Sequence, residues 1–584
     1  MAKWFIHSKK ADFNEIGKKF NISPVMSRII RNRDIIGDDE IAKYLNGGLD
    51  DLYSPFLLDG MKDAVELIFS EIEKNTKIRI IGDYDIDGVC ATYILLKGLE
   101  TLGADVDFAL PHRIIDGYGI NERLTEEAAK EGIGLIVTCD NGIAANDAIA
   151  YAKEKGMKVI VTDHHNPPEV LPNADILINP KKPGDDYPYK EICGAVVAYK
   201  LIEALFEKKG IAKEGKDGIY RFLQFAGFAT VGDVVTLQDE NRIFVKEGLK
   251  QLNNTEIIGL KALIDVSALG NSTIKAYHLG FVLGPCINVC GRIESASKAL
   301  ELLLCTDYQK AISLASDIRN LNEDRKQMTE YALKAAYEIL DGREDEKVLV
   351  VYLPDCHESI VGIVAGRIKE HYYKPTIVLT NGLSEGDDAT IKGSARSIEK
   401  YDMFEELQKH KDMFAKFGGH KMAAGMTLKA DVTPEDLSKA LNLDCALTDD
   451  DLIKKIWIDT ELPFSVIDFN LIDSLDLLEP FGTGNPKPVF ALRNVRIKAM
   501  AYMGKEGQFL RFNLEDERGK SLSAVMFEDA VETAEYLKEK FGDTEVSRAL
   551  KGDKNDIKVN ALFYPQINEF RGDKNIQLVI AGLV

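Results

Sequence analysis

The sequence lacks the long apolar runs that cross a membrane: no stretch of 18 apolar residues free of charge occurs among its 584 residues. Its N-terminus, Met1-Ala-Lys-Trp-Phe-Ile-His, becomes charged too early for the apolar segment of a signal peptide. Cysteine is scarce, with eight residues at no regular spacing, which excludes a disulfide scaffold. We therefore expect buried thiols in a reducing compartment and a cytoplasmic location.

Basic residues are also in deficit. The chain carries 73 basic and 94 acidic side chains, a formal net charge of −21, which argues against a protein that coats a membrane or polyanion with its whole surface. A local basic groove can exist within an acidic total, so the charge leaves nucleic acid open as a partner. No internal repeat or low-complexity tract is present. At about 100 to 200 residues per domain, the length predicts about four structural units.

The period of the apolar residues divides the chain into helical and strand-rich parts. Five short β-rich runs between residues 78 and 178 alternate with helical stretches, which predicts a parallel α/β sheet. Beyond Trp457, short strands with little helix predict a small barrel. The expected parts are an N-terminal helical region (1–76), the parallel α/β core (77–306), a connecting helix (307–345), a second α/β unit (346–432), a linker helix (433–456) and the β-rich unit (457–584).

Carboxylates follow three of the predicted strands directly. The first strand leads to Asp83-Tyr-Asp85-Ile-Asp87-Gly, the third to Asp140-Asn141-Gly, and the fourth to Asp163-His164-His165. The carboxyl ends of parallel strands meet at the sheet edge where such folds bind ligands, so these groups should lie together. An isolated Asp-x-Asp would be better explained as a solvated turn. A fourth acid, Asp233, interrupts an apolar stretch, and a buried carboxylate needs a partner such as a metal ion.

This ligand set predicts a chemistry. Mixed carboxylate and imidazole ligands suit Mn²⁺ or Mg²⁺, and the number of carboxylates favours two ions bridged by a shared aspartate. Two such ions can activate a water and stabilise the charge on a phosphoryl group, so phosphoester hydrolysis is expected. The sequence contains no His-Glu-x-x-His, which disfavours a zinc protease, and no P-loop, which disfavours nucleotide-driven work.

The ordered set of motifs resembles the DHH phosphoesterase superfamily. The strand-end motifs and Asp233 carry the resemblance, which is nearest to the bacterial exonucleases that degrade single-stranded DNA from its 5′ end. It covers nearly the whole chain and implies a parallel-sheet DHH core, a second α/β DHH-associated domain and a C-terminal OB-fold barrel. The further matching segments are Ser27–Arg33, Gly284–Arg292, Gly393–Ser397, Phe417–Gly425, Glu479–Phe490 and Ile567–Gly572.

The resemblance also implies roles for the clustered residues. One metal ion would be held by Asp87, Asp140, His164 and Asp233, and the second by Asp83, Asp85 and the shared Asp140. His165 would donate to the scissile phosphate, with Asp163 and Asn141 beside it at the reaction centre. The alternative for His165 is a structural histidine that supports a ligand. Two segments depart from the family pattern, at Cys290 and at Cys356-His357-Glu-Ser359, and the second leaves a role for His357 in doubt.

The candidates for holding phosphate are Arg113, within Pro111–Gly119, and the arginines at 292 and 396, because a guanidinium presents a planar fork that fits phosphate oxygens. For any single arginine the alternative is a surface ion pair. Arg396 is favoured, since Gly393-Ser394-Ala-Arg396-Ser has the composition of an anion-binding loop. Gly418-Gly419-His420 indicates close approach of the backbone to a ligand, or else a tight turn. The predicted substrate-binding residues are Arg113, Asn288, Arg292, Ser394, Arg396, Gly419 and His420.

Aromatic and basic residues mingle in the β-rich C-terminal unit. An OB barrel binds single strands by stacking bases on aromatic rings inside a basic groove. Half or more of the aromatic residues are expected in the barrel core, and the pattern alone does not separate the two groups. The residues are Phe509, Phe512, Phe527, Phe563, Tyr564 and Phe570, with Lys505, Arg511, Lys558, Arg571 and Lys574.

The hypothesis is a two-metal exonuclease that releases 5′-mononucleotides from single-stranded DNA in recombination and repair. Direction and product come from the resemblance. One alternative is a phosphodiesterase of the same superfamily that acts on short oligonucleotides or cyclic dinucleotides, or a pyrophosphatase. Another is a DNA-binding relative without activity, which the retention of every proposed ligand disfavours. A single-strand-binding protein and a RecQ-type helicase are the protein partners that the family suggests.

Overall fold

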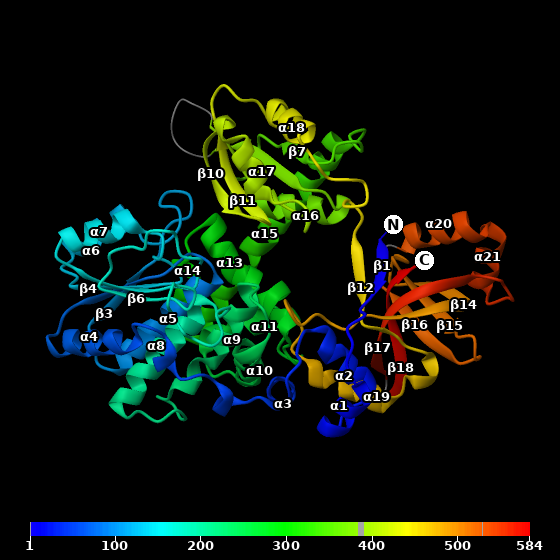
Figure 1. Ribbon diagram of the computed structural model, residues 1–584, viewed down its shortest axis with the longest axis horizontal. Helices are drawn as coiled ribbons and strands as arrows, with labels where there is room; N and C mark the ends of the chain where they lie inside the picture. The colour runs from blue at the N-terminus through cyan, green and yellow to red at the C-terminus, as the bar shows by residue number, and fades with distance from the viewer. Residues whose placement is uncertain (1, 383–389, 528–529, 571) are drawn as a thin grey trace. The chain divides into compact units, whose positions relative to one another are not determined.

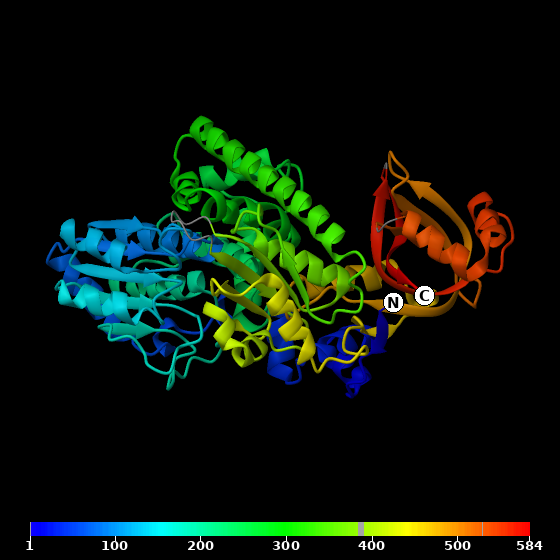
Figure 2. The same ribbon diagram turned by 90° about the horizontal axis from the view of Figure 1, so that it is seen from above.

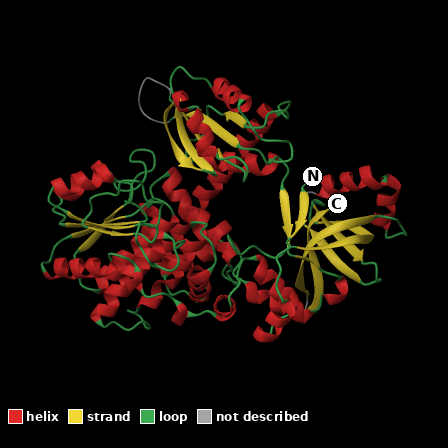
Figure 3. Cartoon of the chain, in the orientation of Figure 1, coloured by secondary structure: helices red, strands yellow, loops and turns green. Residues whose placement is uncertain are grey.

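The computed structural model describes the chain except residues 1, 383–389, 528–529 and 571, and the side chain of Phe570. The chain forms two compact units (Figures 1 and 3). Unit 1 combines residues 1–47 with residues 455–584, and unit 2 comprises residues 48–454. The expected N-terminal helical region, 1–76, is therefore divided between them. Within the described part of the chain, no helix is long and apolar enough to cross a membrane.

The first half of unit 2 is built on a parallel five-stranded sheet in the order β3-β2-β4-β5-β6, as the alternation of strands and helices predicts. Buried apolar residues on one sheet face pack against α4, α5 and α8, and those on the other face pack against α6 and α7. The elements are α4 (Met61–Glu73), β2 (Ile78–Ile81), α5 (Ile86–Thr101), β3 (Val106–Ala109), α6 (Glu122–Lys130), β4 (Leu135–Cys139), α7 (Asn146–Glu154), β5 (Lys158–Thr162), β6 (Ile176–Ile178) and α8 (Gly194–Lys209).

Helices complete this half and lead out of it. They are α9 (Leu223–Gly232), α10 (Asp239–Leu252), α11 (Ile258–Val266), α12 (Ala276–His278), α13 (Gly284–Ile293) and α14 (Ser297–Leu304). The expected connecting helix is α15 (Tyr308–Leu340), capped by the Asp307 side chain and visible as one long helix in Figure 2. Its first part buries Ala311, Ala315 and Ile318 in the core of the parallel sheet, and its last part buries Ala336 and Leu340 against the second α/β unit.

That second α/β unit has a mixed sheet in the order β10-β11-β9-β8-β7. Strands β7 and β8 are parallel, and β9 to β11 add to them in antiparallel pairs. The expected linker helix, α18 (Pro434–Leu443), buries Leu437 and Leu441 in the same core, so it belongs to this unit. The other elements are β7 (Leu349–Tyr352), α16 (Val361–Tyr372), β8 (Thr376–Asn381), β9 (Ile391–Arg396), α17 (Met403–Lys409), β10 (Phe414–His420) and β11 (Ala423–Leu428).

Unit 1 contains the predicted OB barrel. Strand β14 pairs with both β15 and β17, and β16, β18 and β17 complete the circuit, so the sheet closes. The expectation of little helix is wrong, because α20 and α21 lie between β16 and β17. The elements are β12 (Lys455–Ile458), β13 (Thr460–Glu461), α19 (Phe469–Leu475), β14 (Phe490–Met503), β15 (Phe509–Glu515), β16 (Ser521–Met526), α20 (Ala530–Phe541), α21 (Asp543–Lys551), β17 (Lys558–Phe570) and β18 (Asp573–Leu583).

The N-terminal segment packs into this barrel unit. Met26, Ile29 and Ile30 of α2 share one apolar core with the barrel, and β1 (Lys3–Ile6) pairs with β12. Arg33 donates through Nε to Asn485 Oδ1 at 2.6 Å. Two of the matching segments, one N-terminal and one from 479 to 490, thus meet in a buried contact. The remaining helices are α1 (Phe13–Phe20), α2 (Pro24–Asn32) and α3 (Asp38–Asn46).

Candidate active site

The first carboxylate motif lies where β2 ends and α5 begins. Asp85 caps α5, since its carboxylate accepts from the Asp87 and Gly88 amides at 2.9 and 3.1 Å. Asp87 points from the first turn toward the N-terminus of α8, where the Gly194 and Ala195 amides donate to it at 2.6 and 2.8 Å. Asp83 accepts from the Gly119 amide. Helix N-termini favour negative charge, so the fold positions and partly neutralises these side chains.

The second motif lies at the end of β4. Asp140 has a left-handed backbone with φ 61°, which aspartate tolerates better than most residues. A Cβ at Gly194 would stand 2.5 Å from Asp140 Cβ, so only glycine lets the start of α8 approach so closely. Asn141 is buried and donates to the Ile81 and Cys139 carbonyls at 3.0 and 2.9 Å. It also accepts from the Ile120 amide, an arrangement that favours a positioning role for Asn141 over contact with substrate.

The Asp-His-His triplet follows β5, beside β4 in the sheet. Asp163 accepts from His165 Nδ1 at 2.8 Å and from the Ile143 amide at 2.9 Å, so it orients the imidazole. Burial lowers the pKa of His165, but Asp163 and the other carboxylates outweigh burial and raise that pKa to about 9. Burial likewise raises the pKa of Asp163, and the His165 contact outweighs it and lowers that pKa. Asp163 thus orients the His165 ring as a hydrogen-bond donor.

His164 turns into the cluster of carboxylates. Its Nε2 lies 3.1 Å from Asp140 Oδ1, 3.5 Å from Asp87 Oδ2 and 3.7 Å from Asp233 Oδ2. Asp233 sits at the C-terminal end of α9, so the fourth acid comes from a helix and not from a strand. Ligand atoms of Asp87, His164 and Asp233 lie within 4.8 Å of one another, as do those of Asp83, Asp85 and Asp140. A third group combines Asp140, His164 and His165, so ligand atoms of Asp140 lie near both others, and the division of ligands between two ions stays a prediction.

The electrostatics of the cluster fit two divalent cations. Burial and then the neighbouring carboxylates raise the pKa values of Asp83, Asp140 and Asp233 well above the usual range. Asp140 Oδ1 and both ring nitrogens of His164 are buried and have no hydrogen-bond partner among the residues that the structure describes. Buried polar atoms without partners are costly, and oxygen and imidazole donors are those that Mn²⁺ and Mg²⁺ take. The donor set is therefore suited to metal ions.

Tyr118 also belongs to the site, although the sequence did not single it out. Its hydroxyl donates to the Asp140 carbonyl at 2.5 Å and lies 3.1 Å from His165 Nδ1. Its ring stands edge-on to His165, with centroids 5.5 Å apart. Tyr118 lies five residues after Arg113, and only this proximity to a predicted phosphate-binding residue could have indicated a role.

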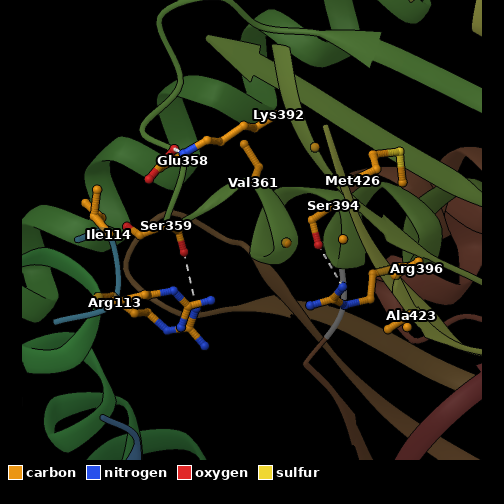
Figure 4. A pocket seen from close by; sticks show the side chains of 16 residues that line it. Arg113, Ile114, Glu358, Ser359, Val361, Lys392, Ser394, Arg396, Ala423 and Met426 are labelled. Atoms are coloured by element: carbon orange, nitrogen blue, oxygen red, sulfur yellow. Dashed lines mark hydrogen bonds and ion pairs between the residues drawn. The ribbon is translucent and has the colours of Figure 1, made fainter. Parts of the chain in front are cut away.

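A cavity of about 450 Å³ is lined by the predicted phosphate-binding arginines Arg113, Arg292 and Arg396 (Figure 4). The Arg113 guanidinium stacks over the Tyr84 ring, 4.9 Å from its centroid. In the sequence, Tyr84 stands between the proposed metal ligands Asp83 and Asp85. Arg292 donates to the Ser359 carbonyl at 3.2 Å, and burial together with Arg113 lowers its pKa to about 10. Burial and Arg113 also lower the pKa of Arg396. Three cations that repel one another in one cavity form a site for an anion.

Some of the other predicted substrate-binding residues line the cavity, and others do not. Ser394, Arg396 and Gly419 line the cavity, whereas His420 is exposed and does not line it. The expectation of an anion-binding loop at Gly393–Arg396 is wrong, because these residues lie on strand β9. Asn288, on α13, accepts from the Ile86 amide at 2.8 Å and so supports the start of α5.

Arg396 offers a test of this cavity. Its Nη1 donates to Ser394 Oγ at 3.0 Å and to the Ala395 carbonyl at 2.7 Å, so the fork is pre-oriented. We expect Arg396→Ala to lower kcat/KM on single-stranded DNA by roughly 10- to 100-fold, the cost of about 1.5 to 3 kcal/mol for a charged hydrogen bond. Arg396→Lys should recover only part, because a point charge replaces a fork. Kinetics equal to those of the parent protein at limiting DNA would show that Arg396 does not contact substrate.

The fold and the site define a DHH-type phosphoesterase. Residues 77–226 match the DHH family, N-terminal domain, residues 345–445 match the DHHA1 domain, and residues 458–582 match the RecJ OB domain. The chain belongs to the RecJ family.

Relatives support this membership along the whole length. The chain is 32% identical over 583 residues to the single-stranded-DNA-specific exonuclease RecJ of Haemophilus influenzae, and the match covers 97% of each protein. It is 36% identical to the Bacillus subtilis exonuclease of the same name, over 88% of this chain and 64% of that longer protein. The crystal structure of RecJ with Mn²⁺ from Thermus thermophilus superimposes with a TM-score of 0.82 and 27% identity, over 100% of this chain and 79% of that one.

Proposed function

We propose that the protein is an exonuclease specific for single-stranded DNA, which hydrolyses phosphodiester bonds from the 5′ end with two Mn²⁺ or Mg²⁺ ions and releases 5′-mononucleotides. The proposal is carried by the buried cluster of carboxylates and His164 together with a cavity lined by three arginines, one of which, Arg113, stacks over Tyr84 between Asp83 and Asp85. A phosphodiester needs both parts, since the cluster can hold the ions and the arginines can hold the anion. The names of the RecJ relatives point to the same substrate.

The residues divide the work as follows. The proposed ligands are Asp83, Asp85, Asp87, Asp140, His164 and Asp233, and the ions they hold would activate a water and stabilise phosphoryl charge. Arg113, Arg292 and Arg396 would bind phosphate oxygens of the strand and fix its position. His165, oriented by Asp163, would donate a hydrogen bond to the scissile phosphate, and Tyr118 would keep the Asp140 loop and the imidazole in place.

Direction and metal dependence can be tested together. Single-stranded oligonucleotides labelled at the 5′ or the 3′ end are incubated with the protein and Mn²⁺ or Mg²⁺. We expect the 5′ label to appear at once in mononucleotides, whereas the 3′ label passes through a ladder of shortening strands. Chelation by EDTA should stop both. Immediate release of the 3′ label, or hydrolysis of dinucleotides alone, would contradict the proposal.

Binding should depend strongly on salt. An acidic protein that binds DNA must use a local basic track, and each phosphate contact gives a slope of roughly −0.7 in log K against log salt for single strands. We expect Asp140→Asn, which binds without cleaving, to lose affinity steeply between 50 and about 200 mM salt. The measurement is fluorescence anisotropy of a labelled oligonucleotide. A flat response would indicate a small phosphodiester as the substrate.

The cellular setting is part of the proposal. We place the protein in the cytoplasm with the DNA it degrades in recombination and repair, which agrees with its eight free cysteines. We propose a RecQ-type helicase and a single-strand-binding protein as partners. A helicase produces single strands from duplex DNA, and a single-strand-binding protein coats them.

A further inference from the structure

A two-stranded parallel ribbon lies outside the barrel of unit 1. Strand β1 pairs with β12 in the register Lys3 with Lys455 and Phe5 with Trp457, and among the described residues neither strand pairs with a third. Side chains alternate between two faces in a strand. One face of the ribbon therefore carries Trp4, Ile456 and Ile458, and the other carries Lys3, Phe5, Lys455 and Trp457.

The first face anchors the ribbon to the barrel. Ile458 is buried in a small apolar cluster with Ala491 of β14 and Leu562 of β17, and Trp4 and Ile456 pack against it. This packing fixes the ribbon on a rigid element, so the opposite face has a defined orientation.

The opposite face presents a row of aromatic rings. Trp457 lies between Phe5, at 5.4 Å between centroids, and His7, which stacks on it at 5.0 Å and 22°. Trp457 is 49% exposed and Phe5 37% exposed. Large aromatic rings are usually buried, so an exposed row of them on a fixed ribbon indicates a surface that contacts another molecule.

The same face is basic in a strongly acidic chain. Lys3 and Lys455 lie on this face, and strands β1 and β12 contain no acidic residue, within a total charge of −21. Lys455 Nζ stands 6.0 Å from the centroid of the Phe5 ring. Lys9 is paired with the exposed Asp34 at 2.6 Å, so Lys3 and Lys455 are the lysines assigned to this face. Asp459 is buried and accepts from Asn32.

We infer that this aromatic and basic face of the β1–β12 ribbon is a second binding surface for single-stranded nucleic acid, separate from the barrel strands. Nucleobases stack on Trp457 and Phe5, and the lysines contact the backbone phosphates, because rings supply stacking and ammonium groups supply charge. The barrel continues from β12 into β13 and β14, which makes the ribbon an extension of the predicted DNA-binding unit. The inference rests on the proposed function and assigns it a further contact.

The chain holds two tryptophans, one on each face of the ribbon, which allows a direct test. Trp4→Phe leaves Trp457 as the sole reporter, and Trp457→Phe leaves Trp4. Each variant is titrated in EDTA with a single-stranded oligonucleotide about 30 nucleotides long, and anisotropy of a labelled strand reports binding independently. We expect the emission of Trp457 to be quenched as the strand binds and that of Trp4 to change little.

Affinity provides the second measurement. Trp457→Ala should weaken binding of the same oligonucleotide by about fivefold or more, the lower end for loss of one stacked base, and Trp457→Phe should lose less. Tyr331→Ala, which removes an exposed ring of α15 far from the ribbon in sequence, is the matched control and should bind normally. Circular dichroism confirms that each variant is folded.

The outcomes separate this inference from the proposed function. If the strand binds and is cleaved, but Trp457 emission does not change at saturation, or Trp457→Ala binds as tightly as Tyr331→Ala, the ribbon is not a nucleic-acid surface. The barrel and cavity then account for binding alone, and the open ribbon edges suit an added peptide strand instead. If no oligonucleotide binds the intact protein, the inference and the proposed function are both overturned.

Discussion

Asp140→Asn is expected to abolish hydrolysis of single-stranded DNA, with a loss of roughly a thousandfold or more, since even residues that only support metal ligands cost 10- to 100-fold when changed. Asp140 belongs to two of the three groups of ligand atoms, one with Asp83 and Asp85 and one with His164 and His165. Asparagine keeps the size of the side chain and tolerates the left-handed backbone, so the change removes charge without straining the loop. The measurement is single-turnover cleavage with saturating Mn²⁺.

Thermal unfolding distinguishes lost metal binding from lost folding. The carboxylates repel one another without cations, so Asp140→Asn should be at least as stable as the parent protein in EDTA. The parent should gain stability on addition of Mn²⁺, because a ligand that binds only the folded state stabilises it, and the variant should gain less. Asp186→Asn, an exposed acid outside the cluster, is the control and should behave as the parent does. Full cleavage by Asp140→Asn would remove Asp140 from the metal site.

Removal of unit 1 is expected to weaken the binding of long DNA strands while leaving phosphodiester hydrolysis at the active site intact. Two stacked bases at about 1 kcal/mol each give about 30-fold in affinity. A protein of residues 48–454 should therefore lose at least that factor in kcat/KM on a long single strand and hydrolyse a dinucleotide almost normally. The cut must remove residues 1–47 together with residues 455–584, because Met26, Ile29 and Ile30 would otherwise lose the core in which they are buried.

The comparison needs both substrates. Circular dichroism and Mn²⁺-dependent stabilisation show whether residues 48–454 remain folded with a working metal site. Equal losses on the long strand and on the dinucleotide would mean that unit 1 only supports the catalytic unit. No loss on either would exclude unit 1 as the DNA grip.

The position of the site follows from local sequence, and several of its details do not. Asp83, Asp140 and Asp163 each follow an apolar run that any period analysis finds, and parallel pairing then brings the run ends together. Tyr118 was missed because the role of a hydroxyl depends on where its loop folds. Asn141 stands in the same motif as Asp140, yet its amide serves the backbone. Sequence shows that a polar residue is present, but not which atoms it faces.

The fold was predicted where the signals are local. The α15 helix, the strands of the parallel sheet, and β7 and β8 of the second α/β unit follow from their apolar periods. The packing of the N-terminal helices on the barrel cannot be predicted from local sequence, because its contacts join residues far apart. Arg33, for example, contacts Asn485, 452 positions later. The helices α20 and α21 were missed, since strand-like apolar runs dominate the segment around them.

Because unit 1 combines residues from both ends of the chain, the two units can fold only in a certain order during translation. On the ribosome, residues 48–454 emerge complete before the barrel exists, so the catalytic unit can fold first, while the segment 1–47 waits without the surface that covers its apolar side chains. At about 5 to 20 residues per second this interval lasts on the order of tens of seconds. We therefore expect the N-terminal segment to bind a chaperone during translation. The catalytic unit can form its active site before unit 1, the proposed DNA-binding unit, is complete.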